Sequence, residues 1–282
     1  LQVSHLLSVQ DPDSLRQGIR AMNFDVPVLS PVPSAVSGTK DASISLNGTW
    51  KFLTEKGYQG RAGDIEVPGE WEMQGYHVEK GKSAIYRRSF ILPSDWEGNI
   101  VRIRFDGVSS YGVVKVNGII IGSHEGSFAT FEFDITNAVR PGENMLEVEV
   151  QCETVSDLLA CTSQYAAHPV GGILRKVTLY TLPQINISDF SWDVKFDEHY
   201  RDASIIFNCK VGFNPKTGKK SAVTLEFDIQ DPNGQTLRME GNTFKVPVSK
   251  STSEVDGSIH VMAPGKWDPE HPILYLLTTS LV

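Results

Sequence analysis

The sequence predicts an all-β protein of two consecutive sandwich domains, a jelly roll followed by an immunoglobulin-like domain. Short stretches of alternating apolar residues recur along most of the chain, and Gly, Pro, Asn or Asp residues bound each stretch. No long helical periodicity separates these stretches. The length of 282 residues is enough for two domains, each with its own hydrophobic core.

Residues 1–40 are expected to form an extended N-terminal arm with one short helix. Asp11-Pro12 has the composition of a helix start, with Asp at the N-cap and Pro at the first helical position, and the helix is expected to reach about Met22. Three prolines between residues 27 and 33 then favour an extended segment. Arms of this kind usually wrap around a neighbouring surface.

The first domain is expected at residues 41–183. The stretch 113–121 predicts two strands joined at Asn117-Gly118, the strongest short-range signal for a β-hairpin. Roughly eight strands without an intervening helical pattern are typical of a double-sheet jelly roll. The expected strands are 44–52, 85–92, 100–105, 112–116, 119–121, 129–135, 145–150 and 175–181.

The second domain is expected at residues 184–282, with turns near 214–219 and at 231–234. Six or seven short strands in about 100 residues are typical of an immunoglobulin-like sandwich. If this fold needs one more strand, the domain is truncated and presents an open sheet edge. The expected strands are 185–196, 203–211, 222–230, 236–240, 244–248, 258–261 and 273–282.

Composition narrows the classes of function. Apolar residues make up 40% of the chain and charged residues 21%, as in a soluble globular protein. The longest apolar runs are too short to cross a bilayer, so no membrane span is expected. A net charge of −8 without a basic cluster argues against a nucleic-acid partner. The chain begins at Leu1 without Met or a leader, so we expect a processed or cut protein.

Metal and cofactor chemistry is not expected. The sequence contains no Gly-rich phosphate loop, no His-Glu-x-x-His motif and no nucleophile elbow, and its seven histidines are scattered. The three cysteines are odd in number and lack zinc spacing. Cys152 and Cys161 could pair in an oxidising compartment, but burial of these two and of Cys209 as small apolar residues is preferred. No carboxylate pair can be assigned to catalysis, so the chain alone is expected to be inactive.

Aromatic side chains in loops are the best candidates for a binding site, because aromatic faces hold sugar rings. The tryptophans and tyrosines in loops are Trp71, Tyr76, Trp96, Tyr165 and Trp267. Trp50 and Trp71 have apolar neighbours in the sequence, which favours packing in the core.

Two loops are selected as the candidate site because binding residues ride on loops of a rigid sheet. The first, 75–81, carries Tyr76, His77 and Glu79, and the second, 153–171, carries Tyr165 and His168. Asp134 has a structural interpretation instead: it ends a strand and can accept hydrogen bonds from the following turn.

A series of short motifs resembles the N-terminal sugar-binding domain of family 2 glycoside hydrolases, the group of β-galactosidases, β-glucuronidases and β-mannosidases. These motifs occur in order over about 130 residues, which makes the series specific although each member is weak. They are LNGTWKF at 46–52, VPGEWE at 67–72, YRRSF at 86–90, FDGV at 105–108, VNG at 116–118, FEFDIT at 131–136, PGEN at 141–144 and GGILR at 171–175. WDPEHPILY at 267–275 resembles the family's immunoglobulin-like domain.

The resemblance implies a non-catalytic role for this chain. In the family both catalytic glutamates lie on a TIM barrel that follows these two domains, and this sequence lacks the strand–helix alternation of a barrel. The chain is then the front of a retaining β-glycosidase that shapes the active-site mouth of the barrel. The implied partners are a carbohydrate with a β-linked sugar, the catalytic barrel and a further copy in a homo-oligomer. By analogy we expect a bacterial periplasmic or secreted location.

Two departures from the family pattern leave the sugar open. In β-galactosidases an Asn on one loop and an Asp on another help to bind the sugar. Here the loop 75–83 has no matching Asn, and QYAAHPV at 164–170 has alanines near the position of the Asp. Galactose specificity is therefore not carried over. A free-standing carbohydrate-binding module is the alternative function, and a purely structural or adhesive pair of sandwiches is a third.

Overall fold

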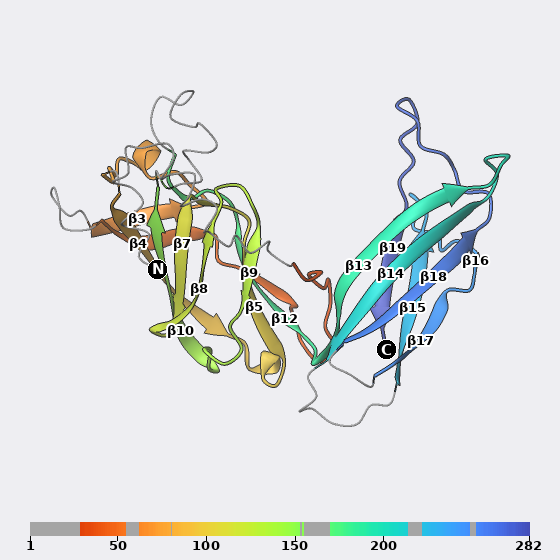
Figure 1. Ribbon diagram of the computed structural model, residues 1–282, viewed down its shortest axis with the longest axis horizontal. Coiled ribbons are helices and arrows are strands. Elements are labelled where there is room, and N and C mark those ends of the chain that lie inside the picture. The colour runs from red at the N-terminus through yellow and green to blue at the C-terminus, as the bar shows by residue number, and fades with distance from the viewer. Residues whose placement is uncertain are drawn as a thin grey trace, which may run out of the picture. The chain divides into compact units, whose positions relative to one another are not determined.

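The computed structural model describes residues 29–54, 62–79, 81–152, 154, 170–213, 222–248 and 252–282. It divides into two compact units between Leu182 and Pro183. In the described residues the regular structure consists of strands and two single-turn 3₁₀ helices, η2 (Glu72–Gln74) and η3 (Ser94–Trp96). The all-β prediction is confirmed (Figure 1). The helix expected over 11–22 lies outside the described residues, and no described helix has the length and apolarity to cross a membrane.

The first unit is a sandwich of two antiparallel sheets, with a small two-stranded sheet beside them (Figure 1). The four-stranded sheet has the order β1 (Ser43–Ser45), β12 (Val177–Leu182), β5 (Ile100–Phe105), β9 (Phe131–Asp134). The six-stranded sheet has the order β3 (Ala62–Val67), β2 (Gly48–Thr54), β4 (Ser83–Leu92), β10 (Gly142–Gln151), β7 (Tyr111–Val116), β8 (Ile119–Glu125). The small sheet pairs β11 (Gly172–Ile173) with β6 (Val108–Ser109).

The hairpin predicted at Asn117-Gly118 is confirmed. Strands β7 and β8 pair in the register Val116 with Ile119, so two residues form the turn. Both turn residues have positive φ, 51° and 82°, as the twist of a two-residue hairpin requires. The Asn117 side chain donates to the Ala138 carbonyl at 2.9 Å and holds the turn against the next segment.

The single strand expected over 44–52 is wrong, because the chain changes sheets at Leu46 and Asn47. The Leu46 N–H donates to the Val177 carbonyl of the four-stranded sheet at 2.9 Å. The Asn47 side chain accepts from the Val177 N–H at 3.1 Å. From Gly48 onward the chain runs in β2 of the other sheet. The alternation of apolar residues is the same in both sheets, so the sequence pattern does not reveal the change.

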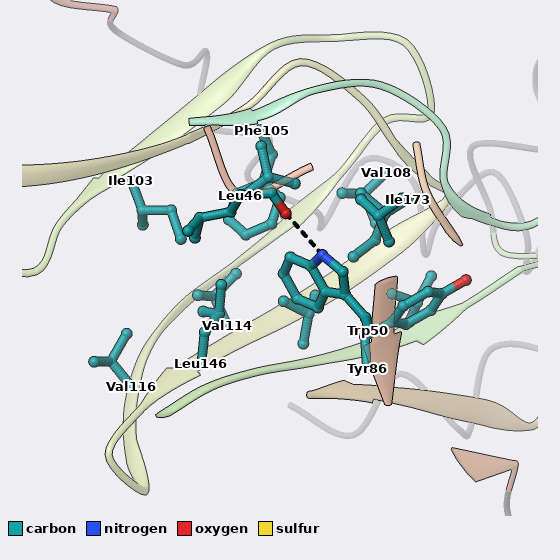
Figure 2. Packing of buried hydrophobic residues seen from close by; sticks show 14 of the residues in the cluster. Leu46, Trp50, Tyr86, Ile103, Phe105, Val108, Val114, Val116, Leu146 and Ile173 are labelled. Atoms are coloured by element: carbon teal, nitrogen blue, oxygen red, sulfur yellow. Dashed lines mark hydrogen bonds between the residues drawn. The ribbon is translucent and has the colours of Figure 1, made fainter. Parts of the chain in front are cut away.

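The core of the first unit lies between its two sheets and is rich in aromatic residues. Trp50, on β2, is fully buried and donates its indole N–H to the Leu46 carbonyl at 2.8 Å (Figure 2). Its ring meets Tyr86 edge-on, with 6.4 Å between centroids. Burial of a large ring stabilises the fold by about 2–3 kcal/mol, and the internal hydrogen bond removes the cost of the buried N–H. The expected packing of Trp50 in the core is confirmed.

The outward face of the four-stranded sheet carries a buried carboxylate, Glu132 on β9. Arg102 lies 2.9 Å from one oxygen of Glu132, and Arg104 lies 2.6 Å from the other. Tyr180 donates its hydroxyl to Glu132 at 2.7 Å, and the Ser30 N–H donates at 2.8 Å. The Glu132 side chain is only 1% exposed, so these four partners compensate for its desolvation. We call these five residues the Glu132 cluster.

The Glu132 cluster ties the N-terminal arm to the sheet. Ser30 contributes both backbone groups, since its carbonyl also accepts a short hydrogen bond from Arg104. Further along, the Lys40 N–H donates to Asp95 at 2.8 Å, and the Asp41 carbonyl accepts from the Trp96 indole at 2.8 Å. Within the described part of the arm, Ser30 and Lys40 are therefore both hydrogen-bonded to the sandwich of the first unit.

The second unit is a sandwich of a four-stranded and a three-stranded antiparallel sheet. The first sheet has the order β13 (Ile185–Phe196), β14 (Ala203–Phe213), β18 (Thr252–Val261), β16 (Met239–Glu240). The second has the order β17 (Thr243–Pro247), β15 (Ala222–Gln230), β19 (Leu276–Leu281). These counts match a constant-type immunoglobulin sandwich. Figure 1 shows β13 and β14 as a long curved hairpin.

Aromatic packing also fills the second core. Phe207 and Phe227 face each other from the two sheets at 4.5 Å between centroids, and Phe244 meets Phe207 edge-on at 4.8 Å. Cys209 lies fully buried beside them, and burial raises the pKa of its thiol to about 11. The turn predicted at 231–234 is confirmed, because Asp231 accepts from the backbone of Asn233 at 2.8 Å. Cys152 is buried in the first unit, and Cys161 lies outside the described residues.

Replacement of Glu132 by Gln is expected to lower the free energy of unfolding at pH 7 by about 3 kcal/mol, because Arg102 and Arg104 lose a buried partner. Burial alone would raise the pKa of Glu132, but hydrogen bonds from Tyr180, Ser30 and Arg104 outweigh it and lower the pKa. The stabilisation is therefore complete above the unfolded-state pKa of about 4.3 and lost as the pH falls through the folded-state pKa.

Urea unfolding at several pH values measures both effects. E132Q should lose part of the acid dependence below about pH 4.3. E143Q, at an exposed position of β10, is the matched control and should change stability by less than about 0.5 kcal/mol. An E132Q protein as stable as E143Q at pH 7 would contradict the role assigned to the Glu132 cluster.

Candidate functional site

Two segments about a hundred positions apart in the sequence cross at one end of the first unit. They are residues 67–71, which begin at the last residue of β3, and residues 171–173, which include β11. The Gly69 N–H donates to the Ile173 carbonyl at 2.9 Å, and the Trp71 N–H donates to the Gly171 carbonyl at 3.2 Å. We call this arrangement the segment crossing. The predicted loop 75–81 follows the first segment, and the predicted loop 153–171 ends in the second, although residues 155–169 lie outside the described part of the chain.

The segment crossing requires glycine at two positions. A Cβ atom on Gly171 would overlap the ring of Trp71, which is 1% exposed and packs directly on the Gly171 backbone. Gly172 has φ +126°, and a Cβ atom there would lie 2.8 Å from the Tyr86 hydroxyl. Burial raises the pKa of Tyr86 far above its ordinary value, so its phenol brings no charge to the crossing. Core packing of Trp71, favoured from the sequence, is confirmed.

Two neighbouring serines hold the residues on either side of the range 155–169. The Ser110 hydroxyl lies 2.8 Å from the Thr154 hydroxyl, in a buried hydrogen bond. The Ser109 hydroxyl donates to the Val170 carbonyl at 2.7 Å. Since Ser109 and Ser110 are adjacent, Thr154 and Val170 are attached to almost the same point. We call these four residues the serine anchor.

The structure places three of the predicted site residues on one loop. The Tyr76 hydroxyl donates to the Asp64 carbonyl at 2.9 Å, and its ring lies 4.6 Å from that of Phe52. Tyr76 therefore holds the loop to the sheet. His77 is exposed and lies 2.7 Å from the Glu72 carboxylate. The side chain of Glu79 is exposed as well, so it and His77 are available at the surface.

The other predicted site residues, Tyr165 and His168, lie outside the described residues. The prediction that Trp96 is a loop aromatic available for binding is wrong, because Trp96 is 1% exposed and belongs to the core. Trp96 is the last residue of the 3₁₀ helix η3, and its indole N–H donates to the Asp41 carbonyl, so that the ring points inward. Trp267 is 58% exposed in the second unit. Asp134 behaves as predicted and accepts from the Thr136 N–H at 2.9 Å.

Sequence reasoning missed the serine anchor. The only signal is a Ser-Ser pair at 109–110 in an otherwise apolar stretch, and serines in loops and strand ends rarely stand out. The described residues contain no group of three or more His, Cys, Asp or Glu side chains arranged to hold a metal ion. What the arrangement offers is a rigid end of a sandwich that carries loops.

The fold defines a class of protein, a chain of two antiparallel β-sandwich domains. Comparison with known families agrees. Residues 77–183 match the sugar binding domain of glycosyl hydrolases family 2, and residues 185–282 match a second model described as glycosyl hydrolases family 2. The two matches follow each other and together cover most of the chain, so this chain belongs to glycosyl hydrolases family 2.

Curated relatives are named as enzymes and are much longer. A β-galactosidase of Priestia megaterium is 29% identical over 289 residues, which cover 89% of this chain and 28% of the relative. A β-galactosidase of Clostridium acetobutylicum is 25% identical and is matched by 83% of this chain over 28% of its own length. The chain thus spans about a quarter of the curated relatives it matches.

Solved structures show the same fold. A glycosyl hydrolase family 2 member from Bacteroides cellulosilyticus has a TM-score of 0.69 at 22% identity, over 86% of this chain and 34% of its own. A β-glucuronidase of Bifidobacterium dentium has a TM-score of 0.65 at 22% identity, over 86% of this chain and 46% of its own. The resemblance to family 2 glycoside hydrolases predicted from the motifs is confirmed.

Replacement of Gly171 by Ala is expected to lower the free energy of unfolding by about 2–3 kcal/mol, because the added methyl group overlaps the buried Trp71 ring. Gly38→Ala is the control: Gly38 has positive φ, +85°, and nothing lies within 4 Å of a Cβ atom there. Its expected cost is about 1 kcal/mol from the backbone alone. Urea unfolding compares the two, and equal losses would contradict the packing argument.

Proposed function

We propose that this chain is the non-catalytic front part of a retaining β-glycosidase. In this proposal its domains are 41–183 and 184–282, and the first shapes the active-site mouth of a catalytic TIM barrel elsewhere in a longer parent protein. The observation that carries the proposal is the succession of two family 2 matches in a chain that spans only 23–28% of its β-galactosidase relatives. The substrate is a carbohydrate with a β-linked sugar.

The geometry of the first unit supports a role in positioning loops. The segment crossing and the serine anchor hold residues at the ends of both predicted loops. The hydrophobic core of the first unit supports these residues. Rigid support of loops is how accessory domains contribute side chains to a neighbouring site. In the proposal four side chains contact the sugar, namely those of His77, Glu79, Tyr165 and His168. Tyr76 holds its own loop in place.

Turnover of nitrophenyl β-glycosides tests the proposal directly. The 282-residue chain should release no nitrophenol above the buffer rate, whereas the full-length parent should hydrolyse at least one β-linked substrate. Turnover by the pure chain would contradict the non-catalytic role. Saturable binding of a neutral glycan by the chain, lost on Tyr165→Ala, would favour the free-standing carbohydrate-binding module instead.

Ser109→Ala in the full-length parent tests the positioning role. Loss of one hydrogen bond, to the Val170 carbonyl, should raise KM about threefold to tenfold and leave kcat within about twofold. The matched control is Ser89→Ala on the outward face of β4, where the side chain is exposed and both kinetic constants should stay unchanged. An unchanged KM in S109A would mean that the anchor has no effect on the active-site mouth.

A further inference from the structure

A hollow of about 370 Å³ lies over strands β3, β2 and β4 of the six-stranded sheet, and most of the residues that line it have outward side chains. Outward side chains of three adjacent strands, β3, β2 and β4, form its walls and floor. Its volume suffices for a small molecule, and β3 contributes only a methyl group at residue 62. The lining side chains used below are Lys51, Leu53, Ala62, Asp64, Ile85 and Arg87.

A row of charged residues crosses the sheet at the level of this hollow. The strand register pairs Asp64 with Lys51 and Lys51 with Arg87. It then pairs Arg87 with Glu147 and Glu147 with Lys115. Lys51 lies 2.6 Å from Asp64, Arg87 lies 2.7 Å from Glu147, and Lys115 lies 3.1 Å from Glu147.

The charges of this row alternate except at one step. Lys51 and Arg87 are direct cross-strand neighbours, and like charges in such a pair repel each other. Each has its carboxylate partner on the far side, Asp64 for Lys51 and Glu147 for Arg87. Both cations line the hollow. An anion placed over this step would lie between two positive charges and complete the alternation.

We propose that the hollow binds a sugar ring that carries one carboxylate or sulfate group. The ion pair of Arg87 with Glu147 uses Nε, and within the described residues this leaves the two terminal nitrogens for a planar oxyanion, which arginine contacts in a bidentate manner. Lys51 adds a second positive charge beside it. The hollow therefore favours an anion, because Lys51 and Arg87 are neighbouring cations with no carboxylate between them.

The apolar part of the lining fits a ring. Leu53 and Ile85 are cross-strand neighbours in direct register, and Ala62 pairs with Leu53 from the other side. Together they offer an apolar floor to the C–H face of a sugar, and the volume lies at the lower end of the range for small-molecule sites. That the ligand is a sugar rests on the proposed function, whereas its negative charge rests on the charge row alone.

Titration calorimetry of the chain at low salt tests the site with glucuronate, glucose and sodium sulfate. Glucuronate should bind with a Kd of about 1 mM, as expected for exposed cations, and at least tenfold more tightly than glucose. Glucuronate should also bind more tightly than sulfate. No binding, or equal binding of glucose and glucuronate, would overturn the proposal. Equal binding of sulfate and glucuronate would overturn its sugar part.

Variants locate the site and separate it from the proposed function. Lys51→Gln and Arg87→Gln should each weaken glucuronate binding about threefold to fivefold, and Asp64→Asn should strengthen it by removing a competing carboxylate. Lys245→Gln, an exposed lysine of the second unit, makes the same charge change and should have no effect. Equal weakening by K51Q and K245Q would overturn the placement. These experiments measure binding by the chain, whereas the test of the proposed function measures turnover by the parent. Either proposal can therefore fail without the other.

Discussion

Contact between the Trp71 ring and the bare backbone of Gly171 is the constraint on which the first unit depends. Antiparallel sandwiches are open at their ends, where loops must leave without exposing the core. Here a large ring closes one end, and two backbone hydrogen bonds join the segments that carry it. Because the ring leaves no room for a side chain at 171, both segments are fixed in position, and so are the starting points of the loops beyond them.

The two sheets of this unit differ in how their outward charged side chains are paired and exposed. On the four-stranded sheet the arm covers Glu132, so its charge is paired and hydrogen-bonded on every side. On the six-stranded sheet Lys51, Asp64 and Arg87 are largely exposed to water, where their ion pairs contribute little to stability. The charges on the four-stranded sheet therefore hold the arm against the sandwich. Those on the six-stranded sheet can exchange partners at small cost, which is what a surface that binds a small ligand needs.

Local patterns predicted most of the fold, and the failures share one cause. Asn117-Gly118 and Asp134 act through neighbours in the sequence, so their roles could be predicted. The inward position of Trp96 and the change of sheet at Leu46 depend on residues far along the chain, Asp41 and Val177. The serine anchor likewise joins residues 44 and 61 positions apart. Such long-range contacts cannot be read from a single sequence. The sequence therefore predicted which loops carry the candidate site but not how their side chains are arranged.

The Glu132 cluster also imposes an order of events during synthesis. Ser30 leaves the ribosome 102 residues before its partner Glu132. At ordinary elongation rates of roughly 5–20 residues per second, this interval is about 5–20 seconds. Tyr180, a further member, follows Glu132 by 48 residues. Ser30 is therefore made well before the side chains that hold it, and the described part of the arm can reach its final position only after Glu132 and Tyr180 have been made.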